Sequence, residues 1–292
     1  MSDIQQLSKI LKLSNSAIDR FQQCPRSFYW EYIAEEKPPK GAVRSFYAHY
    51  GTLIHFLVEM YPRTQDPEQD FEWKANDLAW AEKKDEIETY LDNYGNQIME
   101  QKIKLDVPKM LAIYNQLFPL IQFENEKTKN EYYVQGINFI ETIPDINWDH
   151  VIGLEQRFRI NLENGVVPIT GVIDKVERDE KGLIVTDYKT SKPYSANEIM
   201  KKNQLPLYGM ACYFLYGEFP YKYRYHFTRF NKVVEVEIPM QRLTDVRNGI
   251  AFRYAQMLAF EKQGNFPPVY NDFFCKSFCP FSDSCELFKQ YN

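Results

Sequence analysis

The sequence predicts an α/β protein whose central sheet is mixed and flanked by helices. Apolar and alternating segments typical of strands are grouped in the second half of the chain, while helix-like patterns precede, interrupt and follow them. This succession of helices, strands, helix and strands is typical of one sheet with helices packed on it. The strand candidates are residues 151–160, 166–178, 182–190, 221–230 and 232–239.

Length and composition agree with a folded core. The chain has 292 residues, of which 44% are hydrophobic and 16% aromatic, and these fractions exclude general disorder. No apolar run reaches the roughly 18 residues of a membrane helix, and the N-terminus lacks the pattern of a secretory signal. The net charge of -5 disfavours a protein that coats nucleic acid, but it does not exclude a local basic groove. We therefore expect a cytoplasmic protein without membrane contact.

The first folded segment is expected to contain two short helices. They lie within residues 14–34, with Ser14 or Ser16 as the cap of the first helix. Pro25 suits the first position of the second helix, because its missing N–H has no partner there in any case. This arrangement puts Cys24 at the junction of the two helices.

The next segments are also expected to be helical. A helix through residues 51–61 carries His55, for which a hydrogen-bonded core position is the alternative to a role as a ligand. Residues 66–147 are rich in Glu, Lys, Asn and aromatic residues and contain few strand signals. Helix-like patterns around 77–92 and 95–118 indicate a helical insertion.

The strand region follows this insertion. Residues 151–160 alternate, which puts Glu155 on the face opposite Leu154 and Phe158. The next two strand candidates are joined by the turn sequence of residues 179–182, which ends in glycine. Two antiparallel strands are expected there.

Helices separate and follow the remaining strands. One helix is expected from about 196 to 216, and it contains Gln204 and Tyr208 at a spacing of four residues. A long helix is expected near 241–263. The tail after Gly264 is aromatic and rich in cysteine.

Charged residues on the core strands require an explanation. Asp187 and Lys189 are two residues apart in an apolar strand, so they project from the same face. Asp174 lies in another apolar run and can meet Asp187 across the hairpin. Buried carboxylates are costly unless a cation pairs with them, and Mg²⁺ or Mn²⁺ prefers such oxygen ligands. The alternative is an ordinary ion pair between Asp187 and Lys189 at a strand end.

Cysteines near the C-terminus indicate a second metal site. Cys275, Cys279 and Cys285 are closely spaced, and in a reducing compartment such groups favour metal binding over disulfides. The fourth thiolate is then Cys24 or Cys212, of which Cys212 lies in an apolar helical run and suits a core position. Four thiolates suit a tetrahedral zinc or an iron–sulfur cluster, and spacing does not decide between them.

Several motifs together resemble one enzyme family. Residues 171–192 resemble the core motif of the PD-(D/E)XK nuclease superfamily, in its RecB-like branch. This branch includes the nuclease domains of bacterial recombination helicases, CRISPR-associated exonucleases and phage exonucleases. Residues 51–55 resemble its glycine-x-x-x-histidine helix, and Gln204 with Tyr208 resembles its glutamine–tyrosine motif. The resemblance implies a restriction-endonuclease-like fold and favours a metal site over a simple ion pair.

The resemblance also implies roles for the polar residues of the strands. Asp174, Asp187, His55 and the carbonyl group of Tyr188 correspond to the metal ligands of the family. Since one ligand is an imidazole, Mn²⁺ is as suitable as Mg²⁺. Ile173 replaces the proline of the family name, a position that varies within the RecB-like branch.

The remaining residues of the motif act on water and substrate in the family. Lys189 corresponds to the lysine that acts on the attacking water. Glu155 matches an acidic residue of the preceding strand, which is either a ligand or a group that orients the lysine. Gln204 and Tyr208 correspond to residues that contact the substrate or brace the lysine.

The cysteines match the iron–sulfur members of this branch. Residues 14–33 resemble their N-terminal cysteine–proline segment. The first gap between the C-terminal cysteines is three residues instead of the usual two, which leaves zinc as the alternative. The implied ligands of a [4Fe-4S] cluster are Cys24, Cys275, Cys279 and Cys285. We accordingly expect one nuclease domain over 1–292, with 66–147 as an insertion and with 14–34 and 264–292 forming the cluster region.

The implied function is that of a metal-dependent DNA exonuclease that hydrolyses phosphodiester bonds from single-stranded ends. The alternative is a non-catalytic subunit that keeps the fold and binds DNA ends or assembles a complex for repair, CRISPR adaptation or phage DNA processing. An oligomer is compatible with either function. Candidate phosphate contacts are Lys189, Lys192, Lys201, Lys202, Lys222, Arg224, Arg229 and Lys232. Candidate base-stacking residues are Tyr221, Tyr223, Tyr225 and Phe227, although the same alternation suits a half-exposed strand.

Overall fold

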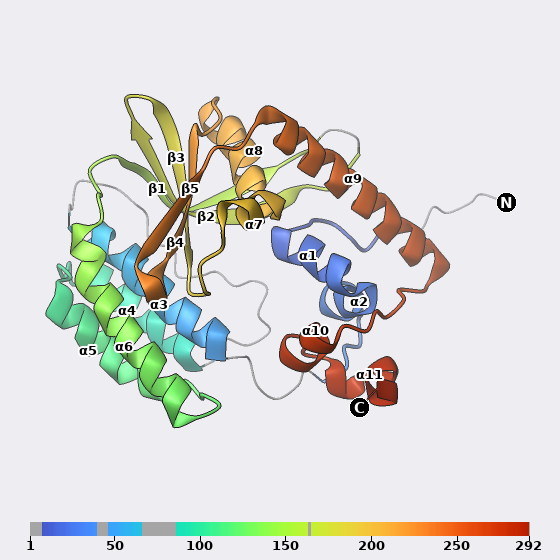
Figure 1. Ribbon diagram of the computed structural model, residues 1–292, viewed down its shortest axis with the longest axis horizontal. Coiled ribbons are helices and arrows are strands. Elements are labelled where there is room, and N and C mark those ends of the chain that lie inside the picture. The colour runs from blue at the N-terminus through green and yellow to red at the C-terminus, as the bar shows by residue number, and fades with distance from the viewer. Residues whose placement is uncertain (1–7, 40–45, 66–85, 163–164, 292) are drawn as a thin grey trace.

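A mixed five-stranded sheet forms the centre of the computed structural model, which describes residues 8–39, 46–65, 86–162 and 165–291 (Figure 1). The strands lie side by side in chain order, and only β3 and β4 run parallel. The predicted mixed α/β sheet is therefore confirmed. The strands are β1 (Val151–Ile160), β2 (Ile169–Asp179), β3 (Gly182–Lys189), β4 (Lys222–Phe227) and β5 (Lys232–Val236).

Two short helices begin the described chain as the sequence predicts. They are α1 (Asn15–Gln23) and α2 (Pro25–Tyr32), with Cys24 at the junction. The Ser14 hydroxyl caps α1 by accepting a hydrogen bond from the N–H of Ala17 at 3.1 Å. Just before this cap, Leu13 pairs with Ile169 at the start of β2, so the N-terminal segment is attached to the sheet.

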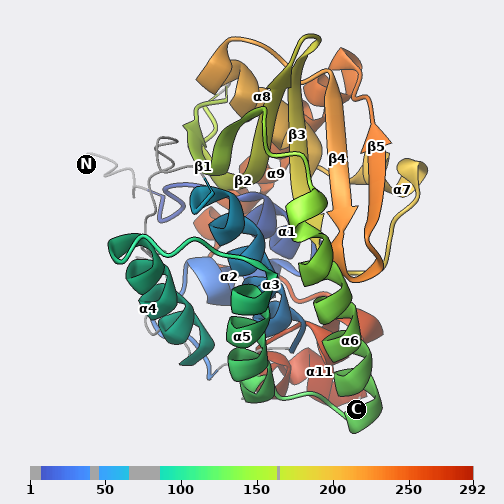
Figure 2. The same ribbon diagram turned by 90° about the vertical axis from the view of Figure 1, so that its left-hand side faces the viewer.

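A second group of helices has its own core. Its elements are α3 (Phe46–Arg63), α4 (Glu86–Glu100), α5 (Val107–Leu117) and α6 (Glu126–Thr142), with short 3-10 turns at Phe118–Leu120 and Ile143–Asp145. The core of this group contains residues such as Tyr50, Leu57, Tyr114 and Phe139. It also contains Tyr188 of β3, so this helical core meets the sheet. Figure 2 shows the helices below the sheet.

One predicted helix in this region is two helices. The expected helix over 95–118 is interrupted, because Lys102 has a φ of 51° and Asp106 caps a new helix through a hydrogen bond from the N–H of Lys109. The helix α6 was not predicted. The expected helix over 77–92 lies largely outside the described residues, and only its end falls in α4.

Helices α7 (Ala196–Lys201) and α8 (Gln204–Tyr216) connect β3 to β4. The prediction of a single helix over 196–216 is wrong. Pro206 has no N–H to donate to the carbonyl group of Lys202, so a continuous helix would lose a hydrogen bond at this point. The guanidinium group of Arg242 donates instead to the carbonyl oxygens of Met200, Lys201 and Lys202.

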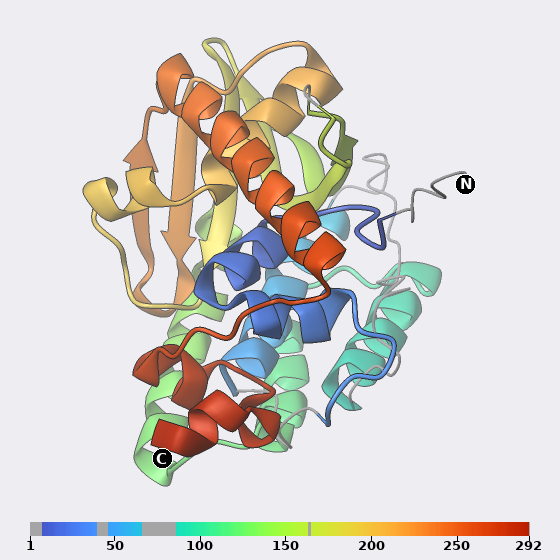
Figure 3. The same ribbon diagram turned by 90° about the vertical axis from the view of Figure 1, so that its right-hand side faces the viewer.

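The long helix α9 (Met240–Gln263) crosses the face of the sheet, and α1 and α2 lie next to its C-terminal end (Figure 3). The main core between the sheet and α1, α8 and α9 contains Ile173, Val185 and Tyr225. Cys212 is fully buried in this core, as its apolar surroundings predict, and burial raises the pKa of its thiol to about 12. The chain ends with α10 (Asp272–Ser277), a 3-10 turn at Ser282–Ser284 and α11 (Glu286–Tyr291).

None of the helices in the described ranges combines the length and the apolar character needed to cross a membrane.

Candidate active site

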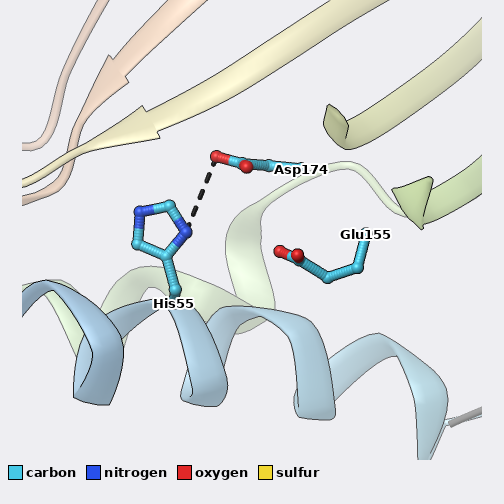
Figure 4. Close-up of side chains that lie close together, drawn as sticks. All are labelled: His55, Glu155 and Asp174. Carbon is cyan, nitrogen blue, oxygen red and sulfur yellow. Dashed lines mark ion pairs between the residues drawn. The ribbon is translucent and has the colours of Figure 1, made fainter. Parts of the chain in front are cut away.

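Three side chains from separate elements converge between the main core and the helical core. His55 comes from α3, Glu155 from β1 and Asp174 from β2, and each offers a ligand atom within 4.8 Å of the other two (Figure 4). In the described part of the chain this is the only group of three or more His, Cys, Asp or Glu side chains that meets this distance. These residues form the acidic site discussed below.

The backbone of Glu155 adopts an unusual conformation. Its φ is +45°, in the left-handed region that residues other than glycine rarely occupy, at a cost of about 1–3 kcal/mol. The pairing of β1 with β2 is irregular just before it, between Val151 and Gly153. Figure 4 shows the carboxylate of Glu155 directed toward His55. The simple alternation expected for this strand does not predict that orientation.

The peptide backbone of Tyr188 connects the histidine to the acidic residues. Its N–H donates to Oδ2 of Asp174 at 2.7 Å, and its carbonyl oxygen lies 3.0 Å from Nε2 of His55. The other ring nitrogen of His55, Nδ1, lies 3.6 Å from Oδ2 of Asp174. The structure thus brings together three of the four predicted metal ligands.

The fourth predicted ligand, Asp187, is adjacent. Its Oδ1 accepts a hydrogen bond from the hydroxyl group of Tyr208 at 3.1 Å. Its buried Oδ2 forms an ion pair with Nζ of Lys189 at 2.7 Å. The carboxylate of Asp187 is therefore held between Tyr208 and Lys189, beside the other three predicted ligands.

Like charges crowd the acidic site. Burial raises the pKa of Asp174 to about 6, and the charge of Asp187 adds to this increase. Burial also raises the pKa of Glu155 well above its usual value, with further contributions from Asp174 and Glu59. Glu59 itself is held by an ion pair with Arg63 at 2.8 Å. A divalent cation would relieve this repulsion, and three carboxylates with one imidazole are a donor set that suits Mg²⁺ or Mn²⁺. The residues therefore fit such an ion.

Lys189 takes part in a closed ring of polar contacts. Besides the ion pair with Asp187, its ammonium group donates to Oε1 of Gln204 at 2.8 Å. The Nε2 atom of Gln204 donates to the hydroxyl group of Tyr208 at 2.9 Å, and Tyr208 donates to Asp187. Burial opposes the charge of Lys189, but Asp187 and Asp174 outweigh it, and the pKa of Lys189 is raised. The lysine is therefore a cation fixed in one orientation.

A further residue, Tyr225, contacts this ring and is not identified as a part of it by sequence motifs. The hydroxyl group of Tyr225 donates to the same Oε1 atom of Gln204 at 3.2 Å, and Nζ of Lys189 lies 5.2 Å from the centre of the Tyr225 ring. Tyr225 is on β4, directly opposite Asp187 in the parallel pairing. This pairing of β3 with β4 is the signal that could have placed it there.

A cleft of about 850 Å³ opens beside the acidic site. It extends from His55 and Asp174 past Lys189 to α1, α7 and α9. Its walls carry five cationic residues, which are Lys189, Lys201, Lys202, Arg242 and Arg253. The two arginines were not predicted, although Arg242, Asp245, Gly249 and Arg253 recur at the spacing of one helix face.

The other predicted DNA contacts are placed differently. Arg224 pairs with Glu177 and Glu235, and Arg229 is buried against Tyr132 and Glu131. Lys222 also pairs with Glu235. The prediction of stacking faces on β4 is wrong for three residues, because Tyr223, Tyr225 and Phe227 are fully buried. These three residues are spaced by two, so they share the face of β4 that packs into the main core.

The predicted cluster cysteines come partly together. Cys24 and Cys275 share a small apolar cluster with Phe274, and Cys279 packs against it. The N–H of Val269 donates to the sulfur of Cys24 at 3.4 Å, which ties α2 to the C-terminal region. No three of the five sulfur atoms lie within 4.8 Å of one another in the described chain. Cys285 lies between the last 3-10 turn and α11.

Comparisons with known proteins place these features in context. A model of the PD-(D/E)XK nuclease superfamily matches residues 12–286. Two ATP-dependent helicase/deoxyribonuclease subunits, from Clostridium botulinum strains Hall and Langeland, are 26% and 25% identical to the chain over 208 residues. The matched part is 68% of this chain but only 17% of each of these relatives. The crystal structure of a candidate exonuclease from Eubacterium rectale superposes with a TM-score of 0.47 at 10% identity, covering 100% of this chain and 93% of that protein.

Proposed function

The chain belongs to the PD-(D/E)XK nuclease superfamily, and from this premise we propose that it is a metal-dependent DNA exonuclease acting on single-stranded ends. The observation that carries the proposal is the meeting of His55, Glu155 and Asp174 directly beside the ring that holds Lys189. The relatives named as deoxyribonuclease subunits support DNA as the substrate. Hydrolysis is expected to leave a 5′-phosphate and a 3′-hydroxyl group.

We propose that His55, Asp174, Asp187 and the carbonyl oxygen of Tyr188 hold Mn²⁺ or Mg²⁺, with Glu155 as a further ligand or as a residue that orients Lys189. The three ligand atoms of His55, Glu155 and Asp174 that lie within 4.8 Å of one another, and the raised pKa values of Asp174 and Glu155, support a cation in this position. A divalent ion bound there activates water and stabilises the charge that develops on the phosphate.

The protein's own groups position and neutralise the substrate. The ammonium group of Lys189, fixed by Asp187 and Gln204, can donate hydrogen bonds to the attacking water and to a phosphate oxygen. Tyr208 and Tyr225 act through Gln204 and Asp187, so their role is to position the lysine. Lys201 and Lys202 in the wall of the cleft supply positive charge for the neighbouring phosphates.

We further propose that Cys24, Cys275, Cys279 and Cys285 hold a [4Fe-4S] cluster, with zinc as the alternative. The shared cluster around Phe274 supports a common site for the first three. Segments 14–34 and 264–292 also meet where Nε of Arg26 donates to the carbonyl oxygen of Phe266 at 2.6 Å. In this proposal the chain is one nuclease domain over 1–292, and residues 66–147 are an insertion whose described helices contribute to the helical core.

A test of the cluster uses two cysteine variants. Anaerobically purified protein is expected to contain iron and sulfide and to absorb visible light. Cys24→Ala should lose this absorption, whereas Cys212→Ala should keep it because Cys212 lies in the main core. Zinc in place of iron in the purified protein would favour the alternative.

A second candidate function is a DNA-binding subunit without nuclease activity. The observation in its favour is that the relatives are named as subunits of a helicase/deoxyribonuclease and are much longer than the matched region. A partner chain could therefore supply further activities in a repair, CRISPR-adaptation or phage complex.

One experiment separates the two functions. End-labelled single-stranded DNA is incubated with Mn²⁺, Mg²⁺ or EDTA and with wild type, Lys189→Ala or Lys181→Ala. Lys181 is an exposed lysine in the turn between β2 and β3, so its variant is a matched control. We expect metal-dependent degradation by wild type and Lys181→Ala and none by Lys189→Ala. Binding without degradation by the wild type under either metal would favour the non-catalytic subunit.

A further inference from the structure

Three aromatic rings form an exposed row where α3 approaches the C-terminal region. Tyr47 of α3 stacks with Phe278 at 6.4 Å between ring centroids, and Phe278 contacts Phe273 of α10 at 5.2 Å. Their exposed fractions are 45% for Tyr47, 46% for Phe278 and 70% for Phe273. We name these three residues the aromatic row. Large rings left so exposed in succession are uncommon on a surface that binds nothing.

The aromatic row leads to the acidic site. Tyr47 lines a pocket of about 390 Å³ together with Gly51, His55 and Glu155. Tyr47, Gly51 and His55 follow one another at four-residue spacing along a single face of α3. His55 follows Tyr47 by eight residues, which corresponds to about 12 Å along the helix axis. His55 also lines the cleft beside Lys189, so the pocket and the cleft meet at this residue.

The charges around the row limit what can bind there. The pocket beside Tyr47 carries Glu88, Asp92 and Glu155, which repel phosphate groups. Two cationic side chains lie beside the other two rings. The guanidinium group of Arg20 donates a hydrogen bond to the carbonyl oxygen of Phe278 at 3.4 Å. Lys276 lies on α10 between Phe273 and Phe278, where its ammonium group is exposed to about one half and pairs with Asp272 at 2.6 Å. This pattern suits a ligand that places flat, uncharged groups on the three rings and directs its anionic groups toward Arg20 and Lys276, away from the carboxylates of the pocket.

Resting on the proposed nuclease function, we propose that Tyr47, Phe278 and Phe273 form a base-stacking subsite for single-stranded nucleic acid that leads toward the acidic site. Unpaired bases stack on exposed aromatic rings regardless of sequence, and phosphates contact nearby cations. In a duplex the bases stack on each other and are not free to use the rings. The subsite therefore selects single strands. Its aromatic residues lie on α3 and in the C-terminal region, not on β4 where the sequence predicted stacking.

Binding measurements test the subsite without relying on cleavage. The dissociation constant of a labelled oligothymidine and of a duplex of equal length is measured by fluorescence anisotropy in EDTA, which stops metal-dependent hydrolysis. The variants are Phe273→Ala and Phe278→Ala. The matched control is Phe214→Ala, since Phe214 of α8 is 59% exposed and lines neither the cleft nor the pocket.

Each of the two phenylalanine variants is expected to bind the single strand about tenfold more weakly, within the range measured for the loss of one base–aromatic stack. Phe214→Ala should bind like the wild type, and Phe273→Trp should restore binding because it keeps a stacking face. Phe273 is so exposed that its replacement should leave the melting temperature unchanged, and its variant decides the matter if Phe278→Ala unfolds.

Two results would overturn the proposal. One is single-strand binding by Phe273→Ala that equals the wild type, and the other is an equal loss in Phe214→Ala. Failure of the nuclease function is distinguishable from both, because a wild type that binds through these rings but cuts no DNA would leave the subsite in place. Conversely, cleavage by the wild type with unchanged binding in both phenylalanine variants would refute the subsite alone.

Discussion

Replacement of Gln204 by leucine tests whether the ring around Lys189 contributes to stability and positions the lysine. Leucine has a similar size but can neither accept from Lys189 and Tyr225 nor donate to Tyr208. The hydrogen bond from the charged lysine is worth about 1.5–3 kcal/mol, and each bond with a tyrosine about 1 kcal/mol. Allowing for the apolar surface that leucine buries, we expect the free energy of unfolding to fall by about 3 kcal/mol.

A matched variant removes only one of these bonds. Tyr225→Phe keeps the aromatic side chain beside Lys189 but loses the hydroxyl group that donates to Gln204. The free energy of unfolding should therefore fall by about 1 kcal/mol. The assay is equilibrium urea unfolding of the wild type, both single variants and the double variant. Since both single variants remove the same contact between Tyr225 and Gln204, the double variant should be less destabilised than the two single effects together, by about 1 kcal/mol.

The same variants separate positioning from folding. Below the unfolding transition, Gln204→Leu should lower kcat more than it raises KM, because the lysine loses its fixed orientation while the cleft residues remain. Tyr225→Phe should show a smaller effect of the same kind. The reasoning is refuted if Gln204→Leu is no less stable than Tyr225→Phe, or if its whole kinetic effect is on KM.

Three further predictions use other parts of the structure. Gly209→Ala in α8 would place a Cβ atom against the hydroxyl group of buried Tyr223, so the free energy of unfolding in urea should fall by about 1–2 kcal/mol. In the matched variant Gly51→Ala of α3, the new Cβ atom meets only Oγ1 of Thr190 at 3.6 Å, and the free energy of unfolding should stay the same or rise. Mn²⁺ should raise the melting temperature of the wild type in a thermal scan, because a bound cation relieves the repulsion between carboxylates in the acidic site. The melting temperature of Asp174→Asn should rise much less, and an equal rise in both proteins would contradict a cation at this site. Burial lowers the pKa of His226, so at this residue the folded state binds fewer protons than the unfolded state, and its contribution to stability should fall as the pH drops below about 6.5. The raised pKa values of Asp174 and Glu155 act in the opposite direction in both proteins, so the measured quantity is the difference between wild type and His226→Gln in urea titrations at several pH values. The wild type should lose stability relative to His226→Gln as the pH falls, and parallel curves would argue against it.

The sequence predicts the sheet well because its strands have clear patterns. The expected bounds of residues 151–160 coincide with β1, and the two strands around the turn at 179–182 differ from β2 and β3 by few residues. The cap at Ser14 and the helix start at Pro25 are also confirmed, since both rest on local backbone chemistry. Such features depend on neighbours in the chain and can be predicted from it.

Features that depend on tertiary contacts are predicted less well. The break between α7 and α8 is compensated by Arg242, which is distant in the sequence, and apolar periodicity continues across it. The burial of Tyr223 and Phe227 depends on the helices that pack against their shared face of β4 in the main core. The orientation of Glu155 depends on a positive φ that no residue type signals. In each case the deciding partner lies elsewhere in the chain.

The acidic site shows the same division. Motif resemblance points to His55, Asp174 and Lys189, and the structure places all three in one region. Helix periodicity in α9 could have added Arg253. Tyr225 could have been added only if the register of β3 and β4 had been known. The aromatic row could not be predicted, because Tyr47 and Phe273 are far apart in sequence and lie in no recognisable motif.

The position of His55 between two cores has a consequence for regulation by partial unfolding. The helical core, which contributes His55 and Tyr47, has contacts largely separate from those between the sheet and α9. Regions with separate cores can open in separate steps with different free energies. A transient opening of the helical core would move His55 away from Asp174 while the sheet remains folded. The proposed metal site and the proposed base-stacking subsite would then be lost together, so a partner that stabilises or loosens these helices would control the proposed activity without touching the carboxylates.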